Sequence, residues 1–117
     1  ENGHYALSAS QLSHIPTAFI CSRDSSAYQL LKILKEKNIR VPEDVSITGF
    51  DDYILSSLCT PKITTYSIDV AKLTDSCIWL LLDRIAQPDR PLRHIVISGK
   101  IMERDSVRTL STNPESR

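Results

Sequence analysis

An alternation of strand, helix and strand patterns constrains the fold of this chain most strongly. The apolar run AFIC at 18–21 comes first, a helical pattern over 25–38 follows, and the β-branched stretch VSITGFDD at 45–52 comes third. Two parallel strands joined by a helix close as a right-handed crossover. The order therefore predicts an α/β fold built on a parallel sheet.

The helix predicted over 25–38 has one apolar and one charged face. Its apolar residues recur at the i, i+3, i+4 and i+7 positions, which line one side of a helix. The apolar face consists of Ala27, Leu30, Leu31 and Leu34, and the opposite face of Lys32, Lys35, Glu36 and Lys37. We expect Asp24 or Ser25 to cap the first turn by accepting a backbone hydrogen bond, and Pro42 to block continuation at the far end.

Two adjacent carboxylates, Asp51 and Asp52, follow the strand in VSITGFDD, which is expected to break at Gly49. In open α/β sheets, ligands bind in the crevice beyond the carboxyl ends of the strands. Acidic side chains at this place are therefore positioned to meet a ligand. Asp51 and Asp52 form the first hypothesis for a functional site.

The rest of the chain continues the alternation of elements. The expected elements are a short helix at 3–13, a loop or short helical turn at 53–62, a strand at 63–68, a helix from Asp69 to 85, and strands at 94–98 (HIVIS) and 100–104 (KIMER), separated by Gly99. Asp69 offers a carboxylate to the first amides of the second long helix. The apolar face of that helix consists of Val70, Leu73, Cys77, Leu80, Leu81 and Ile85.

Composition excludes several classes of function. Lys and Arg equal Asp and Glu at 14 each, so the chain has no basic field with which to hold nucleic acid by charge alone. The three widely spaced cysteines, Cys21, Cys59 and Cys77, lie in apolar runs, which is typical of buried thiols in a reducing compartment. The longest apolar run, 77–82, is far shorter than the roughly 20 residues that span a bilayer, and residues 1–10 lack the pattern of a signal peptide. We expect a cytoplasmic protein.

No constellation of side chains predicts an enzyme or a metalloprotein. The three histidines, His4, His14 and His94, have no spacing to one another or to acidic residues that would suit a metal. No serine lies in a nucleophile elbow. We therefore expect no catalytic residues, no metal and no cofactor.

Residues 16–52, PTAFICSRDSSAYQLLKILKEKNIRVPEDVSITGFDD, resemble the effector-domain signature of the lactose-repressor and galactose-repressor (LacI/GalR) family of bacterial transcription regulators. The family's later motifs follow in order: Pro61-Lys62-Ile63-Thr64-Thr65 stands for its Pro and Leu-Thr-Thr strand, Asp69 follows at the usual interval, and Arg104-Asp105-Ser106 resembles its closing Arg-x-Ser. The resemblance covers nearly all of the chain from Pro16 to Val107.

The resemblance implies a fold and a place within a longer protein. Members have a helix-turn-helix domain and a two-lobed effector domain that is doubly wound and resembles periplasmic sugar-binding proteins. This chain corresponds to the C-terminal part of that effector domain, and the helix-turn-helix domain lies outside it. Residues 1–66 and 99–117 would belong to the C-terminal lobe, and 67–98 to the N-terminal lobe.

The resemblance also implies which residues bind the effector. The family's first Asp after Gly-Phe accepts hydrogen bonds from ligand hydroxyls, and Asp51 occupies that place. The alternative for Asp51 is a cap on the segment that begins at Tyr53. For Asp52 the supporting role outweighs the ligand role.

Arg23 departs from the family pattern, which has Asn at this place. Arginine supplies only donors and a permanent charge, so Arg23 either binds an anionic effector such as a sugar phosphate or sugar acid, or forms a structural ion pair with Asp24, Asp51 or Asp52. The structural ion pair is slightly favoured by the sequence.

Members of the family dimerise side by side. The resemblance places Tyr28, Leu55, Leu58 and Cys59 near the subunit boundary. The alternative is that these residues pack within their own lobe.

Three functions from different classes remain. The leading one is the effector-binding and dimerisation region of a sugar-responsive repressor, which binds operator DNA through its separate helix-turn-helix domain. The second is a periplasmic solute-binding protein of a sugar transporter. The third is a small doubly wound enzyme or receiver domain in which Asp51 and Asp52 hold a metal.

Overall fold

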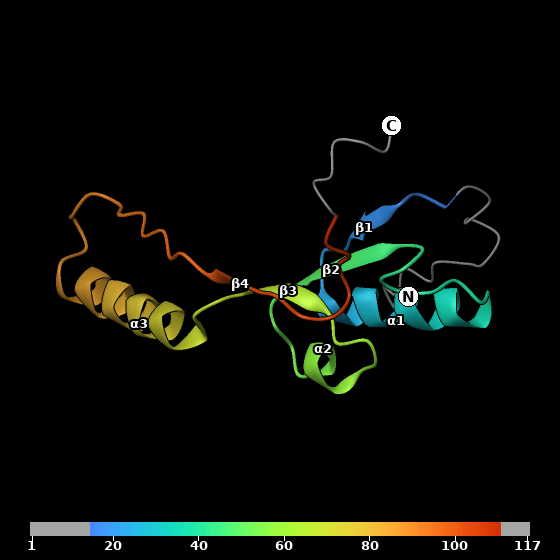
Figure 1. Ribbon diagram of the computed structural model, residues 1–117. Helices are drawn as coiled ribbons and strands as arrows, with labels where there is room; N and C mark the ends of the chain where they lie inside the picture. Colours follow the sequence, from blue (N-terminus) through green and yellow to red (C-terminus); the bar gives the residue numbers. More distant parts are fainter. Residues whose placement is uncertain (1–14, 111–117) are drawn as a thin grey trace.

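The computed structural model describes residues 15–110 (Figure 1). The elements are β1 (Ala18–Ile20), α1 (Asp24–Glu36), β2 (Ser46–Phe50), α2 (Leu55–Leu58), β3 (Thr64–Ser67), α3 (Val70–Ala86) and β4 (Lys100–Met102). The four strands form one sheet in the order β1-β2-β3-β4, in which β1, β2 and β3 run parallel and β4 runs antiparallel to β3. The predicted parallel α/β arrangement is confirmed. The short helix predicted at 3–13 lies outside the described residues.

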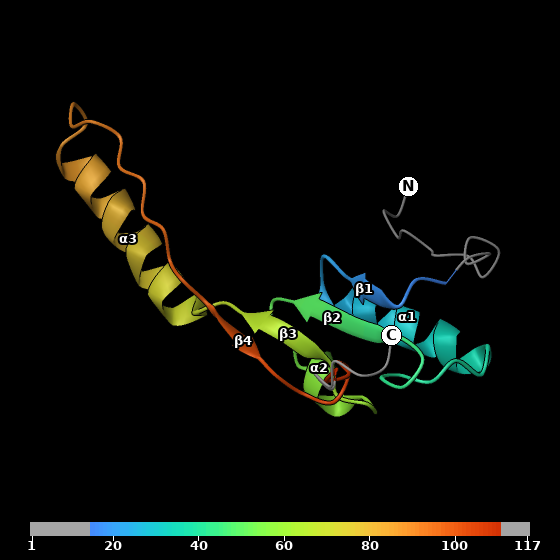
Figure 2. The ribbon, with the colours of Figure 1, turned by 45° about the horizontal axis from the view of Figure 1, so that its top comes forward.

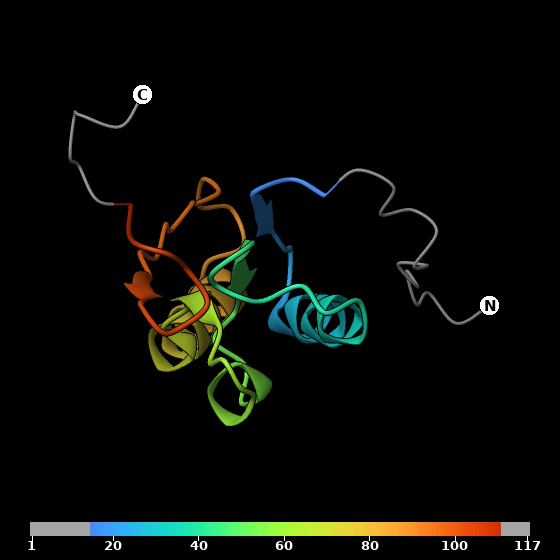
Figure 3. The ribbon, with the colours of Figure 1, turned by 45° about the vertical axis from the view of Figure 1, so that its right-hand side comes forward.

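Helix α1 covers one face of this sheet, as its sequence pattern predicts. All four residues of the predicted apolar face are buried, and all four of the charged face are exposed. The buried face packs against residues of the strands and of their flanking segments. The resulting core consists of Ala27, Leu30, Leu31, Leu34, Val45, Ile47 and Ile63. Helix α2 lies on the same side of the sheet and contacts α1 (Figure 1 and Figure 3).

The first turn of α1 differs from the prediction. The N-cap residue is Arg23, in an extended conformation, and no side chain caps the helix, so the predicted cap at Asp24 or Ser25 is wrong. The carboxylate of Asp24 is fully buried and accepts hydrogen bonds from distant residues instead. A partner far away in sequence outcompetes the local amides for this side chain.

Strand β2 runs through Gly49 to Phe50, so the predicted break at Gly49 is wrong. The glycine has a packing reason. A Cβ atom at this position would collide with Oδ1 of Asp24 and lie 3.1 Å from its Cγ. Glycine therefore makes room for the buried carboxylate behind the strand.

Ser106, which follows β4, forms hydrogen bonds that connect β2 with β3. The hydroxyl of Ser106 donates to the carbonyl of Ile47 in β2 at 2.6 Å and accepts from the amide of Thr64 in β3 at 2.8 Å. The amide of Ile47 donates in turn to the carbonyl of Ser106 at 2.8 Å. The serine of the closing Arg-x-Ser motif thus links β2 to the start of β3 through its hydroxyl, and its carbonyl adds one backbone hydrogen bond to β2.

The chain leaves and re-enters the sheet through two paired strands. Tyr66 lies opposite Ile101, and Ser67 opposite Lys100, in β3 and β4. The amide of Gly99 donates to the hydroxyl of Tyr66 at 2.7 Å, and a side chain at Gly99 would collide with the Tyr66 ring and the carbonyl of Ser67. The crossing is therefore tight.

Residues 69–99, which we call the arm, extend away from the rest of the molecule, which we call the sheet region (Figure 1 and Figure 2). Helix α3 begins where predicted, and its N-cap Asp69 accepts from the amide of Lys72 at 2.9 Å. No residue of α3 is buried. The prediction of a strand at 94–98 is wrong: this stretch is extended but pairs with no strand of the described chain.

The second face of the sheet is open among residues 15–110. Ile20, Phe50 and Ile101 are exposed there by 90%, 42% and 66%, and the Phe50 ring stacks on Tyr66 with the centroids 5.5 Å apart. Parallel sheets normally have helices on both faces. Between residues 15 and 110, no helix is both long and apolar enough to cross a membrane.

Candidate functional site

The predicted site residues Arg23 and Asp51 lie at the same edge of the sheet. Arg23 follows β1 and Asp51 follows β2, and these strands are parallel neighbours. Their carboxyl ends therefore meet at one edge. It is the edge from which β3 continues into the arm (Figure 2). This is the position at which open α/β sheets bind ligands.

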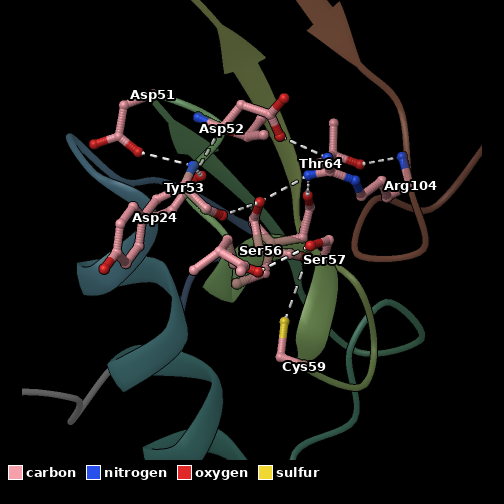
Figure 4. Close-up of polar contacts among 12 residues, drawn as sticks. Asp24, Asp51, Asp52, Tyr53, Ser56, Ser57, Cys59, Thr64 and Arg104 are labelled. Atoms are coloured by element: carbon pink, nitrogen blue, oxygen red, sulfur yellow. Dashed lines mark hydrogen bonds and ion pairs between the residues drawn. The ribbon is translucent and has the colours of Figure 1, made fainter.

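Asp24 lies directly behind this edge. Its Oδ1 accepts from the hydroxyl of Thr65 at 2.6 Å, and its Oδ2 accepts from the amide of Tyr53 at 2.7 Å (Figure 4). Asp24 is 0% exposed and Thr65 is 1% exposed. The carboxylate thus joins the start of α1 to β3 and to the loop that follows β2.

Asp51 presents its carboxylate at the exposed end of β2. Its backbone has φ +94°, and its amide donates to the carbonyl of Tyr66 at 2.9 Å. Its Oδ1 accepts from the amide of Tyr53 at 3.2 Å, but the same amide lies closer to Asp24. Helix α2 begins at Leu55 with no side-chain cap, but the bond from the Tyr53 amide is the contact that the alternative of a cap on the segment from Tyr53 requires, so both roles of Asp51 remain open. Most of the accepting capacity of Asp51 remains open to a ligand.

The electrostatic surroundings of Asp51 make its proton harder to lose. Burial, followed by the negative charge of Asp24, raises the pKa of Asp51 above its usual range. The hydrogen bond from the Tyr53 amide and the positive charge of Arg23 act in the opposite direction but do not prevent the rise. The two acids are thus coupled through space.

Asp52 points away from Asp51 and has a structural partner (Figure 4). Its Oδ1 accepts from Arg104 at 2.5 Å, with both side chains largely buried. Burial by itself would raise the pKa of Asp52, but the hydrogen bond from Arg104 and the charge of Arg104 bring it below its usual range. Arg104 also donates to Ser56 Oγ at 2.8 Å and to the carbonyl of Ile63 at 2.9 Å. This geometry fits the supporting role that the sequence favours for Asp52.

Arg23 is exposed and has no ion-pair partner within the described chain. The ion pairs of residues 15–110 are Arg40–Asp44, Arg90–Asp83, Arg93–Asp83 and Arg104–Asp52. The structural ion pair that the sequence slightly favours for Arg23 is therefore not formed. A free guanidinium and an open carboxylate, Asp51, lie on adjacent strand ends, where they can donate to anionic or carbonyl oxygens and accept from hydroxyls.

The geometry gives little support to a metal at this edge. The carboxylates of Asp51 and Asp52 diverge, and Asp52 is already neutralised by Arg104. Among the residues that the structure describes, no three His, Cys, Asp or Glu side chains gather as a potential metal site.

Sequence reasoning missed the roles of Asp24 and Thr65. It assigned Asp24 to a helix cap and singled out Thr65 only as part of a strand motif. The signal that could have found them is Gly49, since a glycine within a β-branched strand marks a close approach by another group. In this chain that group is the Asp24 carboxylate.

The residues predicted at a subunit boundary lie near the contact of α1 with α2. Leu58 is 71% exposed, whereas Tyr28, Leu55 and Cys59 are half-buried. Tyr28 and Cys59 also pack against the core of the sheet region. A subunit contact at these residues stays a prediction.

Comparisons with known proteins identify relatives of this arrangement. A family model described as a periplasmic binding protein-like domain matches residues 1–107. The chain is 37% identical over 101 residues to the probable HTH-type transcriptional repressor ExuR of Bacillus subtilis (strain 168), and 34% identical over 101 residues to the HTH-type transcriptional repressor PurR of Vibrio atlanticus (strain LGP32). Each match covers 86% of this chain and 30% of the relative.

A solved structure shows the same fold. The LacI family transcriptional regulator from Enterococcus faecium, with bound ribose, superposes with a TM-score of 0.77 at 29% identity. The match covers 88% of this chain and 38% of that one. The chain thus spans about a third of the length of the proteins it matches. It belongs to the periplasmic binding protein-like domain family, and the proteins it resembles there are HTH-type repressors and LacI-type regulators.

Proposed function

We propose that this chain is the C-terminal part of the effector-binding region of a LacI-type transcriptional regulator that acts in the cytoplasm. The observation that carries the proposal is the location of Arg23 and Asp51 at the ends of two adjacent strands, in a fold shared with a ribose-bound regulator. Operator DNA would be bound by a helix-turn-helix domain elsewhere in the protein. The protein would have no catalytic activity.

We propose that the chain divides into two lobes at the crossing between β3 and β4. We assign residues 1–66 and 99–117 to the C-terminal lobe and 67–98 to the N-terminal lobe. Support comes from the arm, which leaves the sheet after Ser67, returns at Lys100, and buries none of the residues of α3. A ligand between the lobes would bind one arrangement of them more tightly and so shift their equilibrium, which is the requirement for coupling to DNA binding.

The effector would be a sugar or a sugar derivative. Asp51 would accept hydrogen bonds from vicinal hydroxyls, and Arg23 would donate to an oxygen-rich or anionic group. The absence of a structural partner for Arg23 within the described chain supports a ligand role for it. Arg23 should contribute more to the affinity for a sugar acid or sugar phosphate than to the affinity for a neutral sugar.

We propose that the protein is a homodimer, with Tyr28, Leu55, Leu58 and Cys59 near the subunit boundary. Support comes from the exposure of Leu58 beside the contact of α1 with α2. Sedimentation of the full-length protein measures this state directly.

The rival function is a solute-binding protein of a sugar transporter, which has the same fold. The matched relatives favour the regulator, because those described above are named transcriptional repressors or regulators. A receiver domain or enzyme that uses Asp51 and Asp52 as metal ligands is disfavoured by the diverging carboxylates.

Calorimetric titration of the full-length protein with neutral sugars, sugar acids and sugar phosphates tests the site. Asp51→Asn is expected to weaken binding of the best ligand by about ten-fold or more, because hydrogen bonds to a charged acceptor are roughly twice as strong as neutral ones. Arg23→Gln should weaken anionic ligands selectively. Asp44→Asn is the matched control, since Asp44 is an exposed acid that pairs with Arg40 away from this edge. Unchanged affinity in Asp51→Asn would remove that residue from the site.

A further inference from the structure

The buried carboxylate of Asp24 connects three segments that converge behind the ligand-binding edge. It belongs to the first turn of α1, yet it binds the hydroxyl of Thr65 in β3 at 2.6 Å and the amide of Tyr53 after β2 at 2.7 Å. Both oxygens are therefore used, and the side chain has no access to solvent. Neither partner lies in α1, so both hydrogen bonds connect the helix to other segments.

The neighbouring backbone is shaped to receive this carboxylate. The position of Gly49 leaves no room for a Cβ atom, because Asp24 Oδ1 occupies that space. Glycine within a strand weakens it, and such a residue often marks a close approach by another group. The absence of a side chain at Gly49 thus leaves the space that the Asp24 carboxylate occupies.

The same carboxylate binds a segment of backbone with two successive positive φ angles. Asp51 has φ +94° and Asp52 has φ +55°, a left-handed region that non-glycine residues rarely adopt. Two successive amides follow Asp51. The amide of Asp52 donates weakly to Thr65 Oγ1 at 3.4 Å, and the amide of Tyr53 donates to Asp24. Asp24 and its partner Thr65 thus hold the backbone directly after Asp51.

We propose that Asp24 is a positioning residue for ligand binding, whose buried carboxylate holds residues 51–53 in the conformation that presents Asp51 at the open edge of the sheet. The inference rests on the proposed function in one respect only, namely that Asp51 contacts the effector. The positioning itself is a property of the molecule without ligand.

The proposal also has an electrostatic consequence. The charged groups that face Asp51 are Asp24 from α1 and Arg23 from the preceding turn, together with the amide of Tyr53. Asp24 contributes to the raised pKa of Asp51, so removal of its charge should lower that pKa. Because this effect acts through space, the titration of Asp51 tests whether the two carboxylates lie close together, whereas hydrogen exchange tests whether Asp24 holds residues 51–53.

Hydrogen exchange of the full-length protein, measured by mass spectrometry without ligand, tests the positioning. Asp24→Asn keeps the shape of the side chain but replaces one acceptor by an NH₂ group, and we expect amides of residues 51–58 to exchange about ten-fold faster. Thr65→Val, which removes the hydroxyl and keeps the shape, should produce a smaller effect in the same residues, and it decides the case if Asp24→Asn does not fold. Ser25→Ala, an exposed change in the same helical turn, is the control. Unaltered exchange at 51–58 in both test variants would overturn the proposal.

Two further measurements separate this inference from the proposed function. Carbon NMR titration of the Asp51 carboxyl should show a midpoint at lower pH in Asp24→Asn than in wild type, and an identical midpoint would overturn the electrostatic coupling. Calorimetry with D-ribose should show several-fold weaker binding in Asp24→Asn, and equal affinity would overturn the link to binding. Failure of the wild type to bind ribose would count against that choice of effector, whereas the exchange result would still decide the positioning.

Discussion

Helices α1 and α3 have similar sequence patterns but opposite environments. Both have an apolar face and both begin and end close to where the sequence places them. Five residues of α1 are buried, whereas none of α3 is, and Val70 and Ile85 of the predicted apolar face of α3 are exposed by 64% and 67%. Periodicity therefore identifies the face that a helix will bury. It does not identify the element that covers this face.

The buried core that stabilises the molecule lies in the sheet region. The core of the sheet region is a single cluster of seven buried apolar residues, and the arm contributes none of them. The arm instead has local contacts, such as Arg93 over the ring of Trp79 at 5.0 Å and Arg90 with Asp83 at 2.6 Å. Substitutions should accordingly have large effects in the sheet region and small effects in the arm.

The largest difference is expected for apolar residues. Leu34→Ala removes a side chain that is 0% exposed, and should lower the free energy of unfolding by about 2–5 kcal/mol. In the 117-residue chain, Leu81→Ala, at a position 60% exposed, should change it by about 0.5 kcal/mol or less. Urea unfolding followed by circular dichroism measures both. Equal losses would show that α3 is covered in solution.

A smaller difference is expected for ion pairs. Arg104→Met leaves Asp52 and the carbonyl of Ile63 without their donor in a largely buried place, and should cost about 1–3 kcal/mol. Arg90→Met breaks a pair whose Arg side chain is 40% exposed, and should cost about 0–1 kcal/mol.

The Arg104 pair should also make stability depend on pH. The pKa of Asp52 is lowered in the folded protein, so its contribution is fully present above the unfolded value of about 4 and is lost as the pH falls through the lower folded value. The stabilities of wild type and Arg104→Met should therefore converge below about pH 4. A constant difference between pH 6 and pH 3 would mean that the ionised pair is not what stabilises the fold.

The smallest effect is expected at the N-terminal ends of the two helices. Asp69→Ala removes the cap of α3 and should cost about 1 kcal/mol, visible as lower helicity, because no buried face compensates for the loss. Ser25→Ala should leave α1 unchanged, since α1 has no side-chain cap and is held by its core. Helicity measured by circular dichroism that stays constant in Asp69→Ala would show that tertiary contacts hold α3.

The sequence predicts those parts of the fold that depend on neighbouring residues. The buried face of α1, the cap at Asp69 and the strand around Thr65 all follow from local spacing and chemistry, and all are confirmed. The strand predicted at 94–98 fails for the complementary reason. A strand needs a partner as well as an apolar pattern, and the described chain supplies none.

Long-range contacts account for what the sequence does not predict at the site. Asp24 binds Tyr53 and Thr65, which lie 29 and 41 residues away, so nothing near it in sequence distinguishes it from an ordinary helix cap. Asp52 is paired with Arg104, which lies 52 residues away from it, whereas Asp51 lies beside the charge of Asp24. Adjacent identical residues acquire different chemistry because the fold gives them different partners.

The tight crossing between β3 and β4 determines how motion in one part reaches the other. Both connections between the sheet region and the arm pass through this crossing, where Gly99 lies against Tyr66. Because β3 and β4 are hydrogen-bonded to each other, they bend together, and a tilt at this point would rotate the arm as a rigid body. Helix α3 has 17 residues and is about 25 Å long, so a tilt of about 10° at its base would displace its tip by about 4 Å.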